Sequence, residues 1–178
     1  VGIENSSNGE ERIEEYSPWF NEYNQMGGKG EVYMEFLLQE LKPYIDRNFR
    51  TKPDANHTAM VGSSMGGLIT LYAAIKYQHI FGRIGILSPS LWFSEEAFLH
   101  VSRIGKQPNT NSRIALLAGA KEPDYVGKAT ERLYRTLLQA GFHNEDLLFE
   151  LIVDGEHNEW FWSKAFKQAY QWMFEIKF

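Results

Sequence analysis

The chain has 178 residues, a length that fits one domain with a substantial buried core. Hydrophobic residues make up 43% and aromatic residues 15%, which excludes a disordered protein. The net charge of −5 argues against a nucleic-acid partner, and the absence of cysteine excludes disulfides and thiolate metal sites.

The first third of the sequence predicts a strand, a loop and a helix. Val1–Glu4 resembles the end of a strand already under way, so we expect an N-terminally incomplete domain. Residues 4–30 are polar and glycine-rich and predict a long loop, while apolar residues at helical spacing predict a helix over 31–48. No apolar run approaches the roughly 20 residues that span a membrane, so we expect no membrane partner. The sequence does not indicate a cellular compartment.

Strands and helices alternate through the rest of the chain. Strands are predicted before Gly62 and over residues 84–87, 113–118 and 147–153. Helices are predicted from Leu68 to Ile75, within 91–112, over 125–141 with a glycine cap, and over about 159–174. This alternation predicts an α/β fold with a mostly parallel sheet and helices on both faces, in a single domain over residues 1–178.

The most informative stretch is Gly62-Ser63-Ser64-Met65-Gly66, between a predicted strand and a predicted helix. Such a strand, sharp turn and helix lift a serine hydroxyl clear of a sheet edge, which predicts Ser64 as a nucleophile. The alternative, a glycine-rich phosphate loop, is disfavoured because no lysine follows the glycines.

A serine nucleophile needs a base, usually a histidine oriented by a carboxylate. Of the five histidines, only His157 stands in a short loop directly after a predicted strand, where ligands of α/β sheets gather. The acid should follow the strand that ends at Gly119, where Glu122 and Asp124 are both candidates. Glu122 is nearer the strand end, and Asp124 has an alternative role as a helix cap.

Backbone and aromatic groups complete the predicted site. The Met65 N–H is expected to stabilise the oxyanion, with a second donor from a loop that would precede Val1. Trp92 and Trp19 are candidates for a substrate pocket, because aromatic rings stack on flat groups. Core packing is the competing interpretation of these rings.

Four separated motifs carry a family resemblance. They are the Val61–Gly67 turn, Leu87–Trp92, Ala118–Pro123 and Gly155–Glu159. Together they resemble the putative esterase (esterase D-like) family of α/β-hydrolases, near its siderophore and feruloyl esterases. The resemblance implies an α/β-hydrolase fold with Ser64 as nucleophile, His157 as base, and Glu122 or Asp124 as acid. Family members carry further strands before the one at Val1, so this sheet is expected to lack its N-terminal strands.

The predicted function is therefore a serine carboxylic-ester hydrolase that acts on a small-molecule ester through an acyl-enzyme. No metal or organic cofactor is implied. An acyltransferase of the same family is the first alternative, and a catalytically silent hydrolase-fold binding module is the second. An exposed sheet edge would be covered by a homo-oligomer or by a missing N-terminal segment.

Overall fold

The computed structural model of the chain describes residues 1–4 and 9–176 and divides into two compact units, Val1–Pro53 and Asp54–Phe178. The first unit contains a helix and a short antiparallel hairpin before residue 30: α1 (Gly9–Tyr16), β1 (Phe20–Asn21) and β2 (Met26–Gly27). A single domain over the whole chain stays a prediction.

Two expectations for the first unit are wrong. Residues 9–27 are not one long loop, because tertiary contacts stabilise α1 and the hairpin. The Glu14 carboxylate accepts the Gly27 N–H at 3.1 Å, and the rings of Tyr16 and Tyr33 meet edge to face at 5.1 Å. Residues 1–4 form no strand: Val1 is 87% exposed, and these residues pair with no strand of the described chain.

The helix expected over residues 31–48 is confirmed with an irregular middle. It consists of α2 (Gly30–Phe36), a π-helical turn (Leu37–Leu41) and α3 (Lys42–Asn48). Pro43 lies at the start of α3 and has no N–H to donate to the preceding turn. The π-helical turn ends at Leu41, two residues before Pro43.

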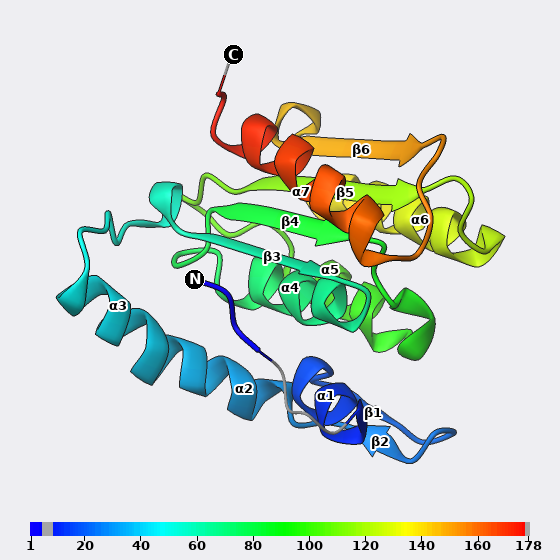
Figure 1. Cartoon of the computed structure of the whole chain (residues 1–178), viewed down its shortest axis with the longest axis horizontal. Coiled ribbons are helices and arrows are strands. Elements are labelled where there is room, and N and C mark those ends of the chain that lie inside the picture. The colour runs from blue at the N-terminus through cyan, green and yellow to red at the C-terminus, as the bar shows by residue number, and fades with distance from the viewer. Residues whose placement is uncertain (5–8, 177–178) are drawn as a thin grey trace. The chain divides into compact units, whose positions relative to one another are not determined.

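The second unit is built on a four-stranded parallel sheet with the order β3-β4-β5-β6 (Figure 1). Its strands are β3 (Ala59–Ser63), β4 (Arg83–Leu87), β5 (Arg113–Gly119) and β6 (Leu147–Ile152). All four lie where the hydrophobic runs predict strands, so the parallel α/β architecture is confirmed.

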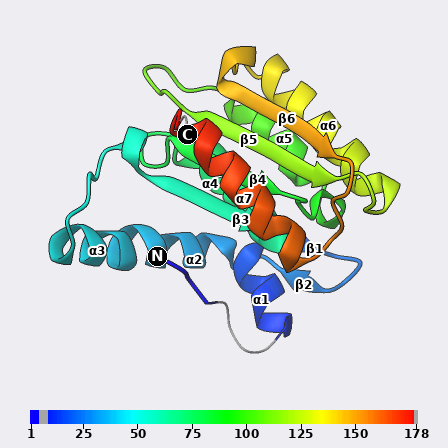
Figure 2. The ribbon, with the colours of Figure 1, turned by 45° about the horizontal axis from the view of Figure 1, so that its top comes forward.

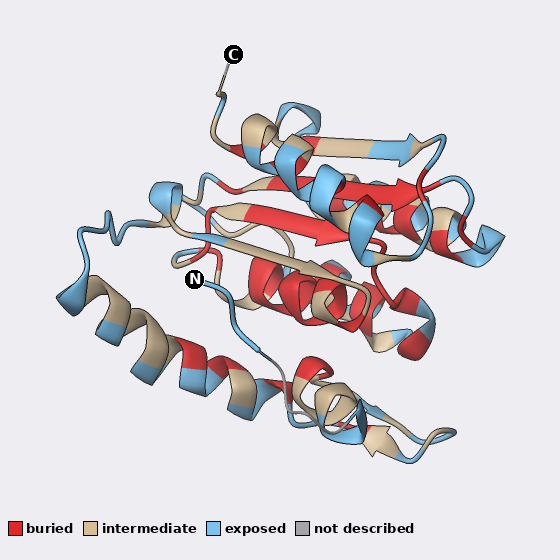
Figure 3. Cartoon of the chain, in the orientation of Figure 1, coloured by how far each residue is buried: buried red, intermediate tan, exposed pale blue. Residues whose placement is uncertain are grey.

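Helices cover both faces of this sheet. They are α4 (Met65–Lys76), α5 (Glu96–Ile104), α6 (Asp124–Gln139) and α7 (Glu159–Met173). Figures 1 and 2 show α7 on one face and α4, α5 and α6 on the other. The middle strands β4 and β5 are consequently almost fully buried (Figure 3), which explains their continuous apolar runs. None of the helices formed by the described residues is long and apolar enough to cross a membrane.

Parallel strands bring their carboxyl ends to one edge of the sheet. Ser64 follows β3, Ser88 follows β4, Glu122 follows β5 and His157 follows β6. The topology therefore gathers four polar side chains that are up to 93 positions apart in the sequence.

Candidate active site

Ser64 occupies a strained turn between β3 and α4. Its backbone has φ 55° and ψ −121°, a region that non-glycine residues rarely adopt and that costs about 1–3 kcal/mol. The turn is tight enough that a Cβ on Gly62 would lie 2.2 Å from the Gly66 carbonyl oxygen. Glycine is therefore required at position 62, and the turn presents the Ser64 hydroxyl at the sheet edge.

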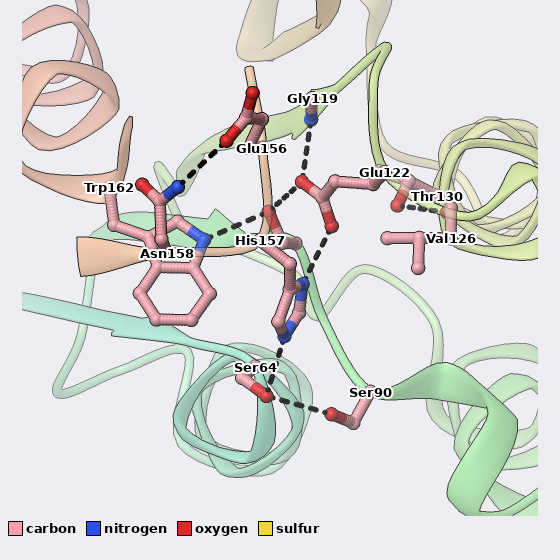
Figure 4. A network of polar contacts seen from close by, with 11 residues as sticks. Ser64, Ser90, Gly119, Glu122, Val126, Thr130, Glu156, His157, Asn158 and Trp162 are labelled. Carbon is pink, nitrogen blue, oxygen red and sulfur yellow. Dashed lines mark hydrogen bonds and ion pairs between the residues drawn. The ribbon is translucent and has the colours of Figure 1, made fainter. Parts of the chain in front are cut away.

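The Ser64 hydroxyl has two polar neighbours (Figure 4). Its Oγ lies 3.1 Å from Nε2 of His157 and 3.2 Å from Oγ of Ser90. The Ser90 N–H also donates to the Ser64 carbonyl oxygen at 3.1 Å, which connects the loop after β4 to the turn. The nucleophile candidate and the base candidate are thus within hydrogen-bond reach.

His157 is oriented by a buried carboxylate. Its Nδ1 lies 2.7 Å from Oε2 of Glu122, and the side chains of His157 and Glu122 are 38% and 0% exposed. The imidazole therefore stands between a carboxylate shielded from water and a serine hydroxyl.

Two further donors hold the other oxygen of Glu122. Its Oε1 accepts the Gly119 N–H at 2.7 Å and the Ser88 hydroxyl at 2.5 Å. Burial raises the pKa of the Glu122 carboxyl, but the hydrogen bonds from His157, Ser88 and Gly119 outweigh it. The pKa of Glu122 consequently lies below its usual range, and the group is ionised at neutral pH.

The charge of Glu122 assigns the proton on the imidazole. An ionised carboxylate can only accept hydrogen bonds, so in the neutral ring Nδ1 of His157 carries the hydrogen. Nε2 is then left with a lone pair that accepts the Ser64 hydroxyl. This arrangement can take a proton from Ser64 and hold the resulting positive charge beside Glu122.

The two loops that carry Glu122 and His157 touch through glycines. A Cβ on Gly119 would lie 2.2 Å from the Gly155 carbonyl oxygen, and one on Gly155 would lie 2.6 Å from the Gly119 Cα. The Lys121 N–H donates to the Gly155 carbonyl oxygen at 3.0 Å across the same contact. This backbone contact sets the distance between acid and imidazole.

Asp124, the other acid candidate, lies outside this network. It is the first residue of α6, and its carboxylate pairs with Lys128 at 3.2 Å with the side chain 90% exposed. The cap position belongs to Pro123, so Asp124 does not cap the helix either. Elsewhere, His57 pairs with Asp54 at 2.8 Å. Within residues 1–4 and 9–176, no cluster of three histidine, aspartate or glutamate side chains could hold a metal ion.

The remaining predicted residues have different positions. Met65 is the first residue of α4, where a backbone N–H has no acceptor within its own helix. Trp92 lies two residues after Ser90 and is 58% exposed. Trp19 belongs to the first unit, and its part in a pocket stays a prediction.

Sequence reasoning gave no catalytic or orienting role to Ser88 or Ser90, and it considered Trp162 only as one of several aromatic residues near the predicted site. All three contact the network. The indole Nε1 of Trp162 donates to Ser88 Oγ at 3.0 Å, and its ring meets the His157 ring edge to face at 4.8 Å. The available signal was the Ser88-Pro89-Ser90 stretch, because it directly follows a buried strand.

Comparison with known proteins identifies the family of the chain. The sequence model of the putative esterase family matches residues 1–173. The chain belongs to this family. The family and its siderophore and feruloyl esterase branch, expected from the four motifs, are thus confirmed, and the family's enzymes are carboxylic-ester hydrolases with an α/β-hydrolase fold.

Several relatives show how much of a longer protein the chain spans. Protein YbbA of Bacillus subtilis is 28% identical over 98% of this chain and 72% of its own length. The endo-1,4-beta-xylanase/feruloyl esterase of Xylanibacter ruminicola is 33% identical over 82% of this chain, but only 18% of its own length. The crystal structure of the Shigella flexneri enterobactin esterase has a TM-score of 0.69 and 25% identity, covering 82% of this chain and 38% of that protein. The chain spans less than half the length of these last two relatives.

Proposed function

We propose that the protein is a serine carboxylic-ester hydrolase that acts through an acyl-enzyme. The observation that carries this proposal is the continuous contact from Ser64 Oγ to His157 Nε2 at 3.1 Å and from His157 Nδ1 to Glu122 Oε2 at 2.7 Å. A hydroxyl, an imidazole and a buried carboxylate in this order are the parts that acyl transfer through serine requires.

Each group has one task in this mechanism. The Ser64 oxygen attacks the ester carbonyl while His157 Nε2 takes the hydroxyl proton. His157 then gives this proton to the leaving alcohol as the ester C–O bond breaks, which leaves an acyl group on Ser64. Water then attacks the acyl carbonyl while His157 takes its proton, and His157 returns this proton to Ser64 as the bond to the acyl group breaks and the acid leaves. Glu122 stays ionised throughout and stabilises the imidazolium.

The oxyanion of the tetrahedral intermediate is assigned to the Met65 N–H. This group begins α4, so the partial positive charge of the helix N-terminus is added to its hydrogen bond. Removal of one oxyanion donor typically costs about 10²–10³ in turnover. Its position directly after Ser64 is the geometry of a nucleophile elbow.

Esters of aromatic acids are the proposed substrates. The enterobactin esterase structure was determined in the presence of 2,3-dihydroxy-N-benzoyl-serine, and the Xylanibacter relative is named a feruloyl esterase. The exposed indole of Trp92 stands in the loop whose Ser90 contacts Ser64. Trp92 is the ring proposed to stack on the acid.

Hydrolysis of p-nitrophenyl acetate with burst kinetics tests the proposal. An acyl-enzyme gives an initial burst of p-nitrophenol equal to the concentration of active protein, because deacylation is slower than acylation. Ser64→Ala should remove the burst and lower turnover by about 10⁴–10⁶. The matched control is Ser63→Ala, one residue earlier, which should keep both. A folded wild-type protein without turnover would refute the proposal and favour the silent binding module.

A further inference from the structure

The hydrogen bonds behind Glu122 have a fixed direction. An indole N–H can only donate, so Ser88 Oγ accepts from Trp162 Nε1 at 3.0 Å. The hydrogen of the Ser88 hydroxyl is then available for Glu122 Oε1 at 2.5 Å. Trp162, Ser88 and Glu122 thus form a directed chain that ends on the carboxylate oxygen turned away from His157.

The Ser88–Glu122 end of this chain is shielded from solvent. Ser88 is 0% exposed, and the Glu122 side chain is also fully buried. Ser88 adopts φ 44°, so its hydroxyl is presented by a backbone conformation that is unusual for serine. A buried hydroxyl on a residue with an unusual backbone conformation, donating a hydrogen bond to the carboxylate, indicates a role in orienting Glu122.

We propose that Ser88 and Trp162 are positioning residues for the reaction, because they lock the Glu122 carboxylate in the rotation that points Oε2 at His157. This inference rests on the proposed function. Trp162 has a second part in it, since its ring packs against the imidazole at 4.8 Å. The one indole therefore restrains both partners of the acid–imidazole pair.

The Ser88 hydroxyl matters because a carboxylate held by few donors can rotate. With Oε1 held by both Ser88 and the Gly119 N–H, Oε2 is left with one direction, toward His157 Nδ1. Without the Ser88 hydroxyl, a single donor holds Oε1 and the carboxylate can turn. His157 then loses its fixed partner, and fewer molecules have Nε2 aligned with the Ser64 hydroxyl.

Three variants test the chain: Ser88→Ala, Trp162→Phe and the double variant. Ser88→Ala should lower kcat about 10–100-fold, the range seen when groups that orient a functional histidine from behind are removed. KM should not change, because Ser88 is buried away from the substrate. Trp162→Phe keeps an aromatic ring beside His157 but removes the donor, so it should lower kcat by less. Because the two residues act in series, the double variant should fall no further than Ser88→Ala alone.

The readout that separates positioning from a merely structural role is the proton NMR signal of His157 Nδ1–H. It reports the hydrogen bond to Glu122 whether or not the protein hydrolyses an ester, so it decides this inference even if the proposed function fails. The signal should shift and broaden in Ser88→Ala and Trp162→Phe. Trp160→Phe, on the same helix with a side chain that is 66% exposed, is the matched control and should leave it unchanged.

The opposite results would overturn the inference. Folded Ser88→Ala with wild-type kcat and an unchanged Nδ1–H signal excludes a positioning role. Independent, multiplicative losses in the double variant exclude action in series. If Ser88→Ala does not fold, Trp162→Phe alone decides, because it leaves the Ser88 hydroxyl and the aromatic ring in place.

Discussion

Ser64 and Ser88 directly follow neighbouring strands, and both have a positive φ. The last residues of the two strands, Ser63 and Leu87, are paired in register, and the serines that follow adopt φ 55° and 44°. Each serine N–H donates to the next strand, Ser64 to the Leu87 carbonyl oxygen at 3.0 Å and Ser88 to that of Leu117 at 2.8 Å. Both hydroxyls contact the His157–Glu122 pair.

The two serines differ in what they face. Ser64 is partly exposed and contacts the imidazole, whereas Ser88 is fully buried and contacts the carboxylate. A serine with positive φ at the end of a parallel strand can therefore present a reacting hydroxyl or an orienting one. Access to substrate and the identity of the partner decide which, and variants of the groups between the two serines test this distinction.

Among variants of the groups around the two serines, the largest effect is expected at Glu122, which links them. In Glu122→Gln the amide oxygen should remain with the Ser88 and Gly119 donors, which turns the NH₂ group toward His157. Nδ1 must then accept, the hydrogen moves to Nε2, and Ser64 loses its base. Turnover should fall about 10³–10⁴-fold, the order seen for the analogous change in a protease triad. Asp124→Asn is the control, and equal losses in both variants would contradict the assignment.

A smaller effect is expected where the acid and imidazole loops touch. Gly155→Ala places a Cβ 2.6 Å from the Gly119 Cα, so the loops must separate. It should destabilise the fold by about 1–3 kcal/mol and lower turnover by moving His157 away from Ser64. Gly127→Ala, inside α6 with Leu151 at an ordinary 3.4 Å, should be neutral or stabilising. Denaturant unfolding measures both, and an unaffected Gly155→Ala would show that the contact is loose.

A modest effect is expected on the substrate side. Trp92→Ala should raise KM for an ester of an aromatic acid about 2–10-fold, because stacking of the acid on the indole contributes about 0.5–1.5 kcal/mol. It should leave KM for p-nitrophenyl acetate nearly unchanged. Steady-state kinetics on both esters checks this, and an equal change for the two substrates would argue against aromatic recognition. Ser88→Ala, by contrast, should change kcat alone.

The smallest effect concerns stability at low pH. The pKa of Glu122 is lowered in the fold by its hydrogen bonds, despite burial, which acts in the opposite direction. Its contribution to stability is therefore fully present above the ordinary glutamate pKa, and is lost as the pH falls through the lowered value. The stability difference between wild type and Glu122→Gln should narrow from pH 7 to pH 3 in denaturant unfolding. A stability difference that widens on acidification would contradict the lowered pKa of Glu122.

Much of the second unit could be predicted from the sequence because its signals are local. Apolar runs predict β4 and β5 directly, and the glycines around Ser64 predict the turn. Side-chain pairing is not local: the bond between Ser88 and Trp162 joins positions 74 apart and depends on how α7 packs. In the same way, residues 9–27 read as a loop because the contacts that stabilise them, such as Glu14 with Gly27, leave no periodic pattern.

The acid shows the same limit at closer range. Glu122 and Asp124 are two residues apart, and either spacing fits an acid after a strand. Helix α6 starts at Asp124, whose carboxylate is exposed to solvent. Glu122 remains in the loop before α6, where its carboxylate accepts the Ser88 hydroxyl. The residue at which α6 begins, which the structure shows, separates the two candidates.

Labelling with a fluorophosphonate probe, followed by mass spectrometry of the labelled peptide, reports directly whether Ser64 is the reactive serine. We expect one label per chain on Ser64, none on Ser88 or Ser90, and no labelling of Ser64→Ala. A label on another serine, or a folded protein that the probe does not label, would contradict this expectation.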